Sequence, residues 1–217
     1  MFKKCLTKMM VCDMAGTTIQ ENGIVYKTLY DSIKTFHPDL KMSEIDDFHG
    51  HRKEDVIKHF IKKPLLFERT STLFNILLIN NYKYSNISLI HPNLLNYFTY
   101  LKNNDIKIAL NTGYNIEVQN ILINKFKLKN YIDDYISSSE VLNGRPHPDM
   151  LNKLMIRNNI LNSEEIIKVG DSKIDILEGK SINCKTVGVL SGSENNEELE
   201  KVNPDFIVDN VTDIKFN

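Results

Sequence analysis

An acidic residue, Asp13, directly follows a short apolar run near the start of the chain. The run Met9–Cys12 is typical of a buried strand, and a turn of small residues that includes Gly16 comes after the acid. In open α/β sheets, ligand sites lie at the carboxyl ends of the strands. Asp13 is therefore placed where a carboxylate can do chemistry, although an isolated Asp-x-x-Gly more often only caps a turn.

Three later stretches add further polar groups at the ends of apolar runs. A predicted strand over 106–111 leads to Thr112 and a glycine, and Arg145 stands between a glycine and a proline. A third apolar run ends in two acids spaced by four, Asp171 and Asp175. Together these stretches supply a nucleophilic carboxylate, a hydroxyl donor, a cation and two more carboxylates, in that order.

Alternating strands and helices must position these groups from residue 91 onward. The predicted strands are 4–13, 106–111, 132–137, 166–170, 185–190 and 206–208; the predicted helices are 92–104, 115–126, 147–158 and 173–181. This alternation predicts an α/β fold with a parallel sheet and right-handed crossovers.

The stretch between about 20 and 90 has a different pattern. Helical spacing is predicted over 24–36, 43–48, 53–62 and 65–81, with no convincing strand. We therefore expect a catalytic core of residues 1–19 and 91–217. An all-helical cap, residues 20–90, is inserted into it after the first strand.

The net charge and the cysteine spacing bear on the partners and the compartment of the protein. Basic and acidic residues nearly cancel, 27 against 28, so net charge supports neither nucleic acid nor a membrane as a partner. The three cysteines include no C-x-x-C pair, which favours free thiols in a reducing compartment. The first apolar run is too short for a secretory signal or a membrane span, and we expect a cytoplasmic protein.

The order of the four stretches resembles the four sequence motifs of the haloacid dehalogenase superfamily. The resemblance implies a Rossmann-like parallel-sheet core with a helical cap inserted after the first strand. It also implies that Asp13 attacks phosphorus and forms an aspartyl-phosphate. A small phosphorylated or phosphonate metabolite is then the expected substrate.

A carboxylate can approach an anionic phosphoryl group only when positive charge screens the two. The resemblance implies a Mg²⁺ ion held by Asp13, Asp171 and the main-chain carbonyl of Ala15. Asp175 would hold a metal-bound water, since residues four apart face one side of a helix. The alternative for Asp171 and Asp175 is capping of the helix N-terminus.

Further groups are expected to bind the phosphoryl oxygens. Thr112 can donate its hydroxyl, helped by the N–H groups of the turn at Gly113, and Gly16 allows close backbone approach. Arg145 can neutralise the transferring group with its fork of donors. The alternatives are a simple strand-end turn at Thr112 and a surface turn at Arg145.

Ala15 narrows the substrate class. Most phosphatases of the superfamily carry a second aspartate at this position, which protonates the leaving alkoxide. The segment Asp13–Thr18 reads Asp-Met-Ala-Gly-Thr-Thr, and it resembles the motif of the phosphonoacetaldehyde hydrolase (phosphonatase) branch. Matching motifs at Thr112-Gly113-Tyr114 and Gly144-Arg145-Pro146 extend the resemblance over most of the core.

That branch also carries a cap lysine shortly after a glycine, and Lys53 lies three residues after Gly50. By resemblance, Lys53 forms an imine with the substrate aldehyde, and the imine accepts the electron pair of the broken carbon–phosphorus bond. Lys53 then needs a lowered pKa, from burial or from cationic neighbours such as Arg52, His49 and His51. The alternative is an exposed lysine at a helix start.

The cap departs from the branch at two positions. His49 stands where the branch has methionine, and Val56 stands where it has a histidine that moves protons. His49 or His51 could take the place of that histidine and contact the substrate. Three functions stay open: phosphonate hydrolysis, phosphate-ester hydrolysis by a phosphatase, and binding of a phospho-ligand with little catalysis. The resemblance also suggests a homodimer formed through the cap.

Overall fold

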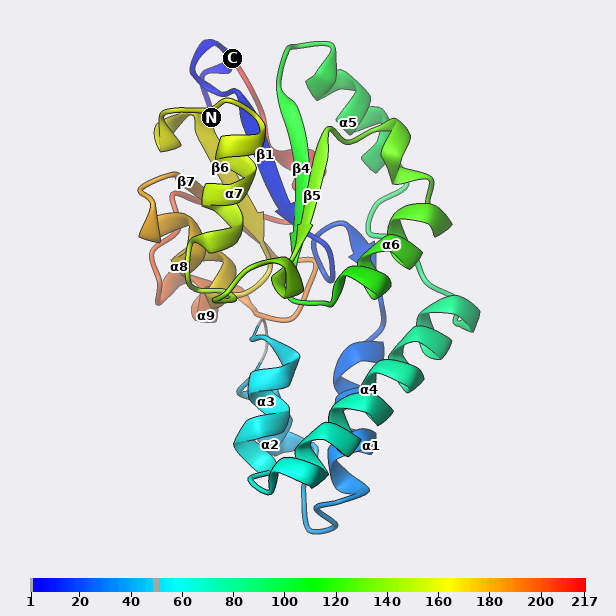
Figure 1. The fold of residues 1–217 in the computed structure, drawn as a ribbon. Helices are drawn as coiled ribbons and strands as arrows, with labels where there is room; N and C mark the ends of the chain where they lie inside the picture. The colour runs from blue at the N-terminus through cyan, green and yellow to red at the C-terminus, as the bar shows by residue number, and fades with distance from the viewer. Residues whose placement is uncertain (1, 49–50) are drawn as a thin grey trace.

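The computed structural model describes residues 2–48 and 51–217, and its centre is a parallel six-stranded sheet (Figure 1). The strand order is β5-β4-β1-β6-β7-β8. The strands are β1 (Met9–Asp13), β4 (Lys107–Thr112), β5 (Asp134–Ser137), β6 (Ile166–Gly170), β7 (Lys185–Val189) and β8 (Phe206–Val208). This sheet confirms the predicted Rossmann-like α/β core.

Helices cover both faces of the sheet, and β1 shows why. Its side chains alternate: Met10 and Cys12 belong to one buried apolar cluster, and Met9 and Val11 to another. The first cluster includes residues of α5 (Leu94–Lys102) and α6 (Ile116–Lys125); the second includes residues of α7 (Asp149–Arg157). Helix α8 (Lys173–Ser181) packs on β6 and β7, and α9 (Asn196–Glu200) lies beside α8. A strand buried on both faces reads as a continuous apolar run, as Met9–Cys12 does.

Four helices form a separate layer beyond the carboxyl ends of the strands, at the bottom of Figure 1. They are α1 (Ile24–Lys34), α2 (Ser43–Asp46), α3 (Lys53–Phe60) and α4 (Pro64–Tyr84). We call residues 24–84 the helical lobe. Pro64 stands in the first turn of α4, where its missing N–H costs nothing. Because it lies beyond the carboxyl ends of the strands, the helical lobe faces the sheet edge at which Asp13 lies.

Two predictions about strands were wrong. The stretch 4–13 is not one strand, because Lys4–Leu6 form a 3₁₀ turn and only Met9–Asp13 pair in the sheet. The stretch 20–90 is not free of strands, because β2 (Ile19–Gln20) and β3 (Ser88–Leu89) pair antiparallel. Two-residue strands are too short to show an alternating pattern. The pair joins the ends of the helical lobe to the core.

The longest helix, α4, has 21 residues. Within residues 2–48 and 51–217, no helix combines the length and the apolar character that crossing a membrane requires.

We expect truncation of a buried side chain on a central strand to destabilise the protein strongly, because it leaves a cavity in the core. Leu110 on β4 is fully buried, and Leu110→Ala should lower the free energy of unfolding by about 2–5 kcal/mol. Urea unfolding followed by circular dichroism measures this change. Leu142→Ala is the control, since Leu142 is 84% exposed and should change stability by about 0.5 kcal/mol or less. Equal effects of the two substitutions would contradict the burial of β4.

Candidate active site

Asp13 ends β1 in the middle of the sheet, and its neighbours in space come from the adjacent strands. Asp13 is paired in register with Asn111 on β4, so Thr112 follows at the same edge. On the other side, Cys12 is paired with Val169 on β6, and Asp171 comes directly after that strand. Parallel pairing thus brings Asp13 close to groups that lie 99 and 158 residues further along the chain.

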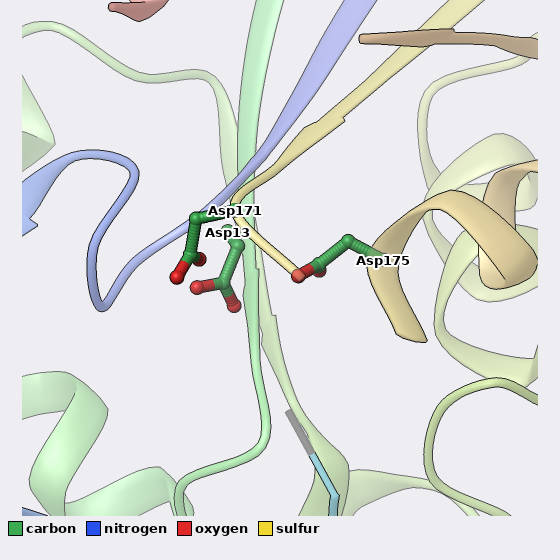
Figure 2. Close-up of side chains that lie close together, drawn as sticks. All are labelled: Asp13, Asp171 and Asp175. Carbon is green, nitrogen blue, oxygen red and sulfur yellow. The ribbon is translucent and has the colours of Figure 1, made fainter. Parts of the chain in front are cut away.

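Three carboxylates converge at this edge (Figure 2). Asp13, Asp171 and Asp175 each offer an oxygen, and these oxygens lie within 4.8 Å of one another. All three residues are buried, and Asp175 reaches in from the first turn of α8. Burial, together with the neighbouring carboxylates, raises the pKa of Asp13 to about 7 and that of Asp171 to about 6. A cluster of hard oxygen ligands with this unfavourable charge suits a divalent cation.

Arg145 supplies the fixed positive charge of the cluster. Its Nη1 donates to Asp13 Oδ1 at 2.7 Å and also to Asp175 Oδ1. Burial by itself would lower the pKa of Arg145, but the charges of Asp175 and Asp13 raise it well above its usual value. The guanidinium is buried, so the surface-turn alternative is wrong. Its Nε is buried without a hydrogen-bond partner among the described residues, which leaves one donor unused.

Asp175 is held by cations rather than used as a helix cap. Lys168 Nζ donates to Asp175 Oδ1 at 2.7 Å, and Ser172 Oγ donates to Oδ2 at 2.6 Å. Burial raises the pKa of Asp175, but the charges of Arg145 and Lys168 outweigh it and lower the pKa to about 2. The N-cap residue of α8 is Ser172, and it makes no side-chain cap hydrogen bond. The capping alternative is therefore wrong for Asp175.

Lys168 is a site residue to which the sequence analysis gave no role. It lies fully buried in β6, and its Nζ also donates to Asn111 Oδ1 at 2.9 Å. Asn111 Nδ2 in turn donates to Glu178 Oε2 at 2.8 Å, so a buried polar network extends beneath the three carboxylates. The available signal was a lysine inside an otherwise apolar strand, because a fully buried charge requires partners.

Asp171 is fixed by a different set of donors. Ser193 donates to Asp171 Oδ2 from its main-chain N at 2.7 Å and from its Oγ at 2.9 Å. Thr17 Oγ1 donates to Oδ1 at 3.2 Å. A side chain at Gly16 would not fit, since an added Cβ would lie 2.5 Å from the Asp171 carboxylate and φ at Gly16 is +76°. The glycine lets the turn after β1 approach Asp171.

A cavity of about 330 Å³ opens above these groups, between the sheet edge and the helical lobe. Asp13, Ala15, Gly16, Thr112, Gly113, Arg145, Asp171, Asp175 and Lys53 all line it. Thr112 Oγ1 accepts from the main-chain N of Tyr114 at 3.3 Å, so its hydrogen is free to donate into the cavity. The strand-end turn and phosphate binding are thus compatible at Thr112. No contact tests the Ala15 carbonyl as a ligand, and that role stays a prediction.

Lys53 begins α3 and is buried, only 5% exposed, so the exposed-lysine alternative is wrong. Its Nζ donates to Tyr26 Oη at 3.1 Å and to the main-chain oxygen of His51 at 2.9 Å. Burial, with a contribution from the charge of Arg145, lowers the pKa of Lys53 to about 8. Arg145 is therefore the cation whose charge helps to lower the pKa of Lys53. Arg52 pairs instead with Glu54 at 3.5 Å.

The structure describes only one of the two cap histidines, His49 and His51, that were predicted to contact the substrate. His51 is partly buried, and it lines a neighbouring pocket with Lys173 rather than the cavity of Asp13. Burial and the charge of Lys53 lower the pKa of His51. His49 lies outside the described residues. Contact of either side chain with the substrate stays a prediction.

Glu21 is a second residue that the sequence analysis missed. It follows β2, is buried, and lines the same cavity as Lys53. Tyr82 from the end of α4 and Tyr114 from the turn after β4 both donate to its Oε2. An acid just after the Asp13 motif was the only signal, and it did not reveal the two tyrosines.

The comparisons with known proteins agree with this geometry. The family model described as haloacid dehalogenase-like hydrolase matches residues 10–189. Phosphonoacetaldehyde hydrolase from Latilactobacillus sakei is 39% identical over 103 residues, which cover 47% of this chain and only 39% of the relative. The enzyme of the same name from Syntrophobacter fumaroxidans is 28% identical over 204 residues, covering 86% of this chain and 74% of the relative.

A solved structure matches over nearly the whole chain. The phosphonoacetaldehyde hydrolase like protein from Oleispira antarctica has a TM-score of 0.86 and 20% sequence identity, with coverage of 99% of this chain and 92% of that one. At this identity the likeness concerns the fold. The family model covers most of the chain and includes the three aspartates that meet at the sheet edge. The chain belongs to the haloacid dehalogenase-like hydrolases.

Proposed function

We propose that this hydrolase cleaves the carbon–phosphorus bond of phosphonoacetaldehyde or a close analogue and releases acetaldehyde and phosphate. Lys53 carries the proposal, because a buried lysine with a pKa of about 8 lines the same cavity as Asp13. A lysine with a lowered pKa has a larger neutral fraction at pH 7–8, and only the neutral amine can attack an aldehyde. The curated relatives named above support the substrate class.

The proposed reaction divides the work between core and helical lobe. Lys53 Nζ and the aldehyde carbon form an imine with loss of water. An Asp13 oxygen then bonds to phosphorus as the C–P bond breaks, and the electron pair of that bond moves into the protonated imine to give an enamine. Water later hydrolyses the aspartyl-phosphate, and protonation of the enamine carbon followed by hydrolysis releases acetaldehyde.

Ala15 fits this chemistry. A carbon leaving group whose electrons pass into an imine needs no acid beside Asp13, whereas an alkoxide does. Arg145 holds Asp13 at 2.7 Å and can neutralise charge on the transferring group. Thr112 and the turn at Gly16 complete the cradle for the phosphoryl oxygens.

In the proposed metal site, Asp13 and Asp171 bind the ion directly, and Asp175 acts indirectly through the groups around them. These residues fit a Mg²⁺ ion, because their oxygens converge and carry excess negative charge. When bound, the ion supplies positive charge that offsets repulsion between Asp13 and an anionic phosphoryl group. Asp175 is already engaged by Arg145 and Lys168, which suits an indirect role.

Phosphate-ester hydrolysis is a second candidate function, because the cavity contains an acid that could replace the aspartate missing at position 15. Glu21 lines the cavity of Asp13, and its carboxyl group could protonate a leaving alkoxide. The two functions differ in their need for Lys53, since an ester requires no imine.

The lowered pKa of Lys53 predicts selective labelling near neutral pH. Modification by a small amine-reactive aldehyde with reductant should rise through a midpoint near pH 8 at Lys53, because the neutral amine is the reacting form. An ordinary lysine titrates near pH 10.4. Peptide mass spectrometry over pH 6–10 measures the profile, and the exposed Lys58 on the same helix is the internal reference. A Lys53 profile that parallels that of Lys58 would contradict the burial argument.

Borohydride trapping with phosphonoacetaldehyde tests the function. We expect a reduced adduct on Lys53 in the wild-type protein and phosphate release in an unreduced control. Asp13→Asn should form the adduct but release no phosphate, because it keeps the lysine and loses the nucleophile. Lys53→Met should lose both.

Two outcomes would overturn the function. Phosphate release from phosphonoacetaldehyde by Lys53→Met would exclude the imine. Absence of both adduct and phosphate release in the folded wild type, with hydrolysis of a phosphate ester that survives Lys53→Met, would establish the second candidate instead.

Metal dependence is the last expected property. EDTA should abolish phosphate release and added Mg²⁺ should restore it. Asp171→Asn should raise the Mg²⁺ concentration needed for half-maximal rate by about tenfold or more. A Mg²⁺-dependent rise in melting temperature gives a readout besides activity, and Asp171→Asn should reduce it. A rate that is unaffected by EDTA would remove the metal from the proposal.

A further inference from the structure

Glu21, Tyr82 and Tyr114 bring three oxygens into one closed triangle. The hydroxyls of Tyr82 and Tyr114 both contact Glu21 Oε2, and they lie 2.5 Å from each other. All three residues are buried, and they come from the linker after β2, the end of α4 and the turn after β4. We call these residues the acid–phenol cluster.

A count of hydrogens favours the acid form of this cluster. Three oxygen–oxygen contacts need three hydrogens, and the two phenols provide only two. A carboxyl hydrogen on Glu21 would supply the third, so that each oxygen donates once and accepts once. Loss of that hydrogen still leaves Oε2 with two phenol donors. The carboxyl group of Glu21 is therefore hydrogen-bonded in both protonation states, and only the contact between the two phenol oxygens loses its hydrogen when the proton leaves.

The pKa of Glu21 points in the same direction. Burial raises it, although the hydrogen bonds from Tyr114 and Tyr82 and the charge of Lys53 act to lower it. The pKa of Glu21 and that of Lys53 thus move toward each other, which is the condition for proton transfer near neutral pH.

The position of Glu21 puts this proton beside the proposed imine. Glu21 and Lys53 line one cavity, and each affects the other through its charge. Two other candidate positions offer no proton: Ala15 has a methyl group, and Val56 is an apolar residue buried in α3. His51 lines the neighbouring pocket. Among the described residues of the cap, two acids share the cavity with Lys53, Glu21 and Asp46. Asp46 is exposed, whereas Glu21 is buried.

We propose that Glu21 is the general acid and base of the Lys53 imine. When the amine has added to the aldehyde, the Glu21 carboxyl proton passes to the hydroxyl of the carbinolamine. The carbon–oxygen bond breaks, water leaves, and the nitrogen lone pair forms the carbon–nitrogen double bond of the protonated imine. In the return step, water adds to the imine carbon and the Glu21 carboxylate takes its proton. This role rests on the proposed function.

The test compares Glu21→Gln with the wild type in the borohydride experiment. Glutamine keeps the size of the side chain and its capacity to hydrogen-bond with both tyrosines, but it has no proton to transfer. We expect the rate of adduct formation on Lys53 to fall about 100-fold or more, with little change in melting temperature. Glu21→Ala should recover part of the rate when formate is added, because formate can supply the missing acid, and a purely structural role would not respond in this way.

Glu54→Gln is the matched control. Like Glu21, Glu54 raises the pKa of Lys53 through its charge, but it does not line the cavity. Its substitution should change the rate less than about threefold. Should Glu21→Gln fail to fold, Glu21→Asp carries the test, since withdrawing the acid by one methylene should slow adduct formation while keeping the charge.

The outcomes separate the two proposals. Adduct formation by Glu21→Gln at the wild-type rate, or an equal loss in Glu54→Gln, would overturn the role of Glu21 and leave the imine intact. Absence of any adduct in the folded wild-type protein would overturn the proposed function and this inference with it.

Discussion

The burial of several like charges at one sheet edge is the constraint on which this structure depends. Asp13, Asp171 and Asp175 converge out of contact with bulk water, and such a cluster is costly unless cations and donors balance it. Arg145 bridges Asp13 and Asp175, Lys168 also pairs with Asp175 from inside β6, and Ser193 and Thr17 donate to Asp171. The repulsion that remains, together with burial, raises the pKa of Asp13 and that of Asp171.

The second organising feature is a cavity that neither layer forms alone. The sheet edge contributes Asp13 and Arg145, and the helical lobe contributes Lys53. The same burial that raises the pKa of Asp13 lowers that of Lys53, because removal from water disfavours the charged form of each. One low-dielectric space thus favours the neutral amine of Lys53, the form that the proposed imine requires. The acid–phenol cluster spans the boundary, since Tyr82 belongs to the lobe and Tyr114 to the core.

The sequence predicted much of this protein. Apolar runs followed by polar residues located the strand ends of the sheet, and their order led to the family. Ala15 and Lys53 were identified through the resemblance to the phosphonatase branch, and the carboxylates and Arg145 through the order of the four motifs. These features are local, because a strand is encoded by consecutive residues and a motif by a few positions after it.

Tertiary structure decided the rest, because it depends on which distant residues meet. Whether Lys53 is buried, which cation acts on it and what holds Asp175 follow from contacts across strands and between layers. The pairs Glu21–Tyr114 and Asp13–Arg145 are separated by 93 and 132 residues, and no local pattern connects them. The two-residue strands β2 and β3 were invisible for a similar reason, since each is defined only by its partner. The sequence by itself determined the class of chemistry and the order of its parts. Packing determined the protonation and partners of those parts, because burial and the neighbouring charges are properties of the folded chain.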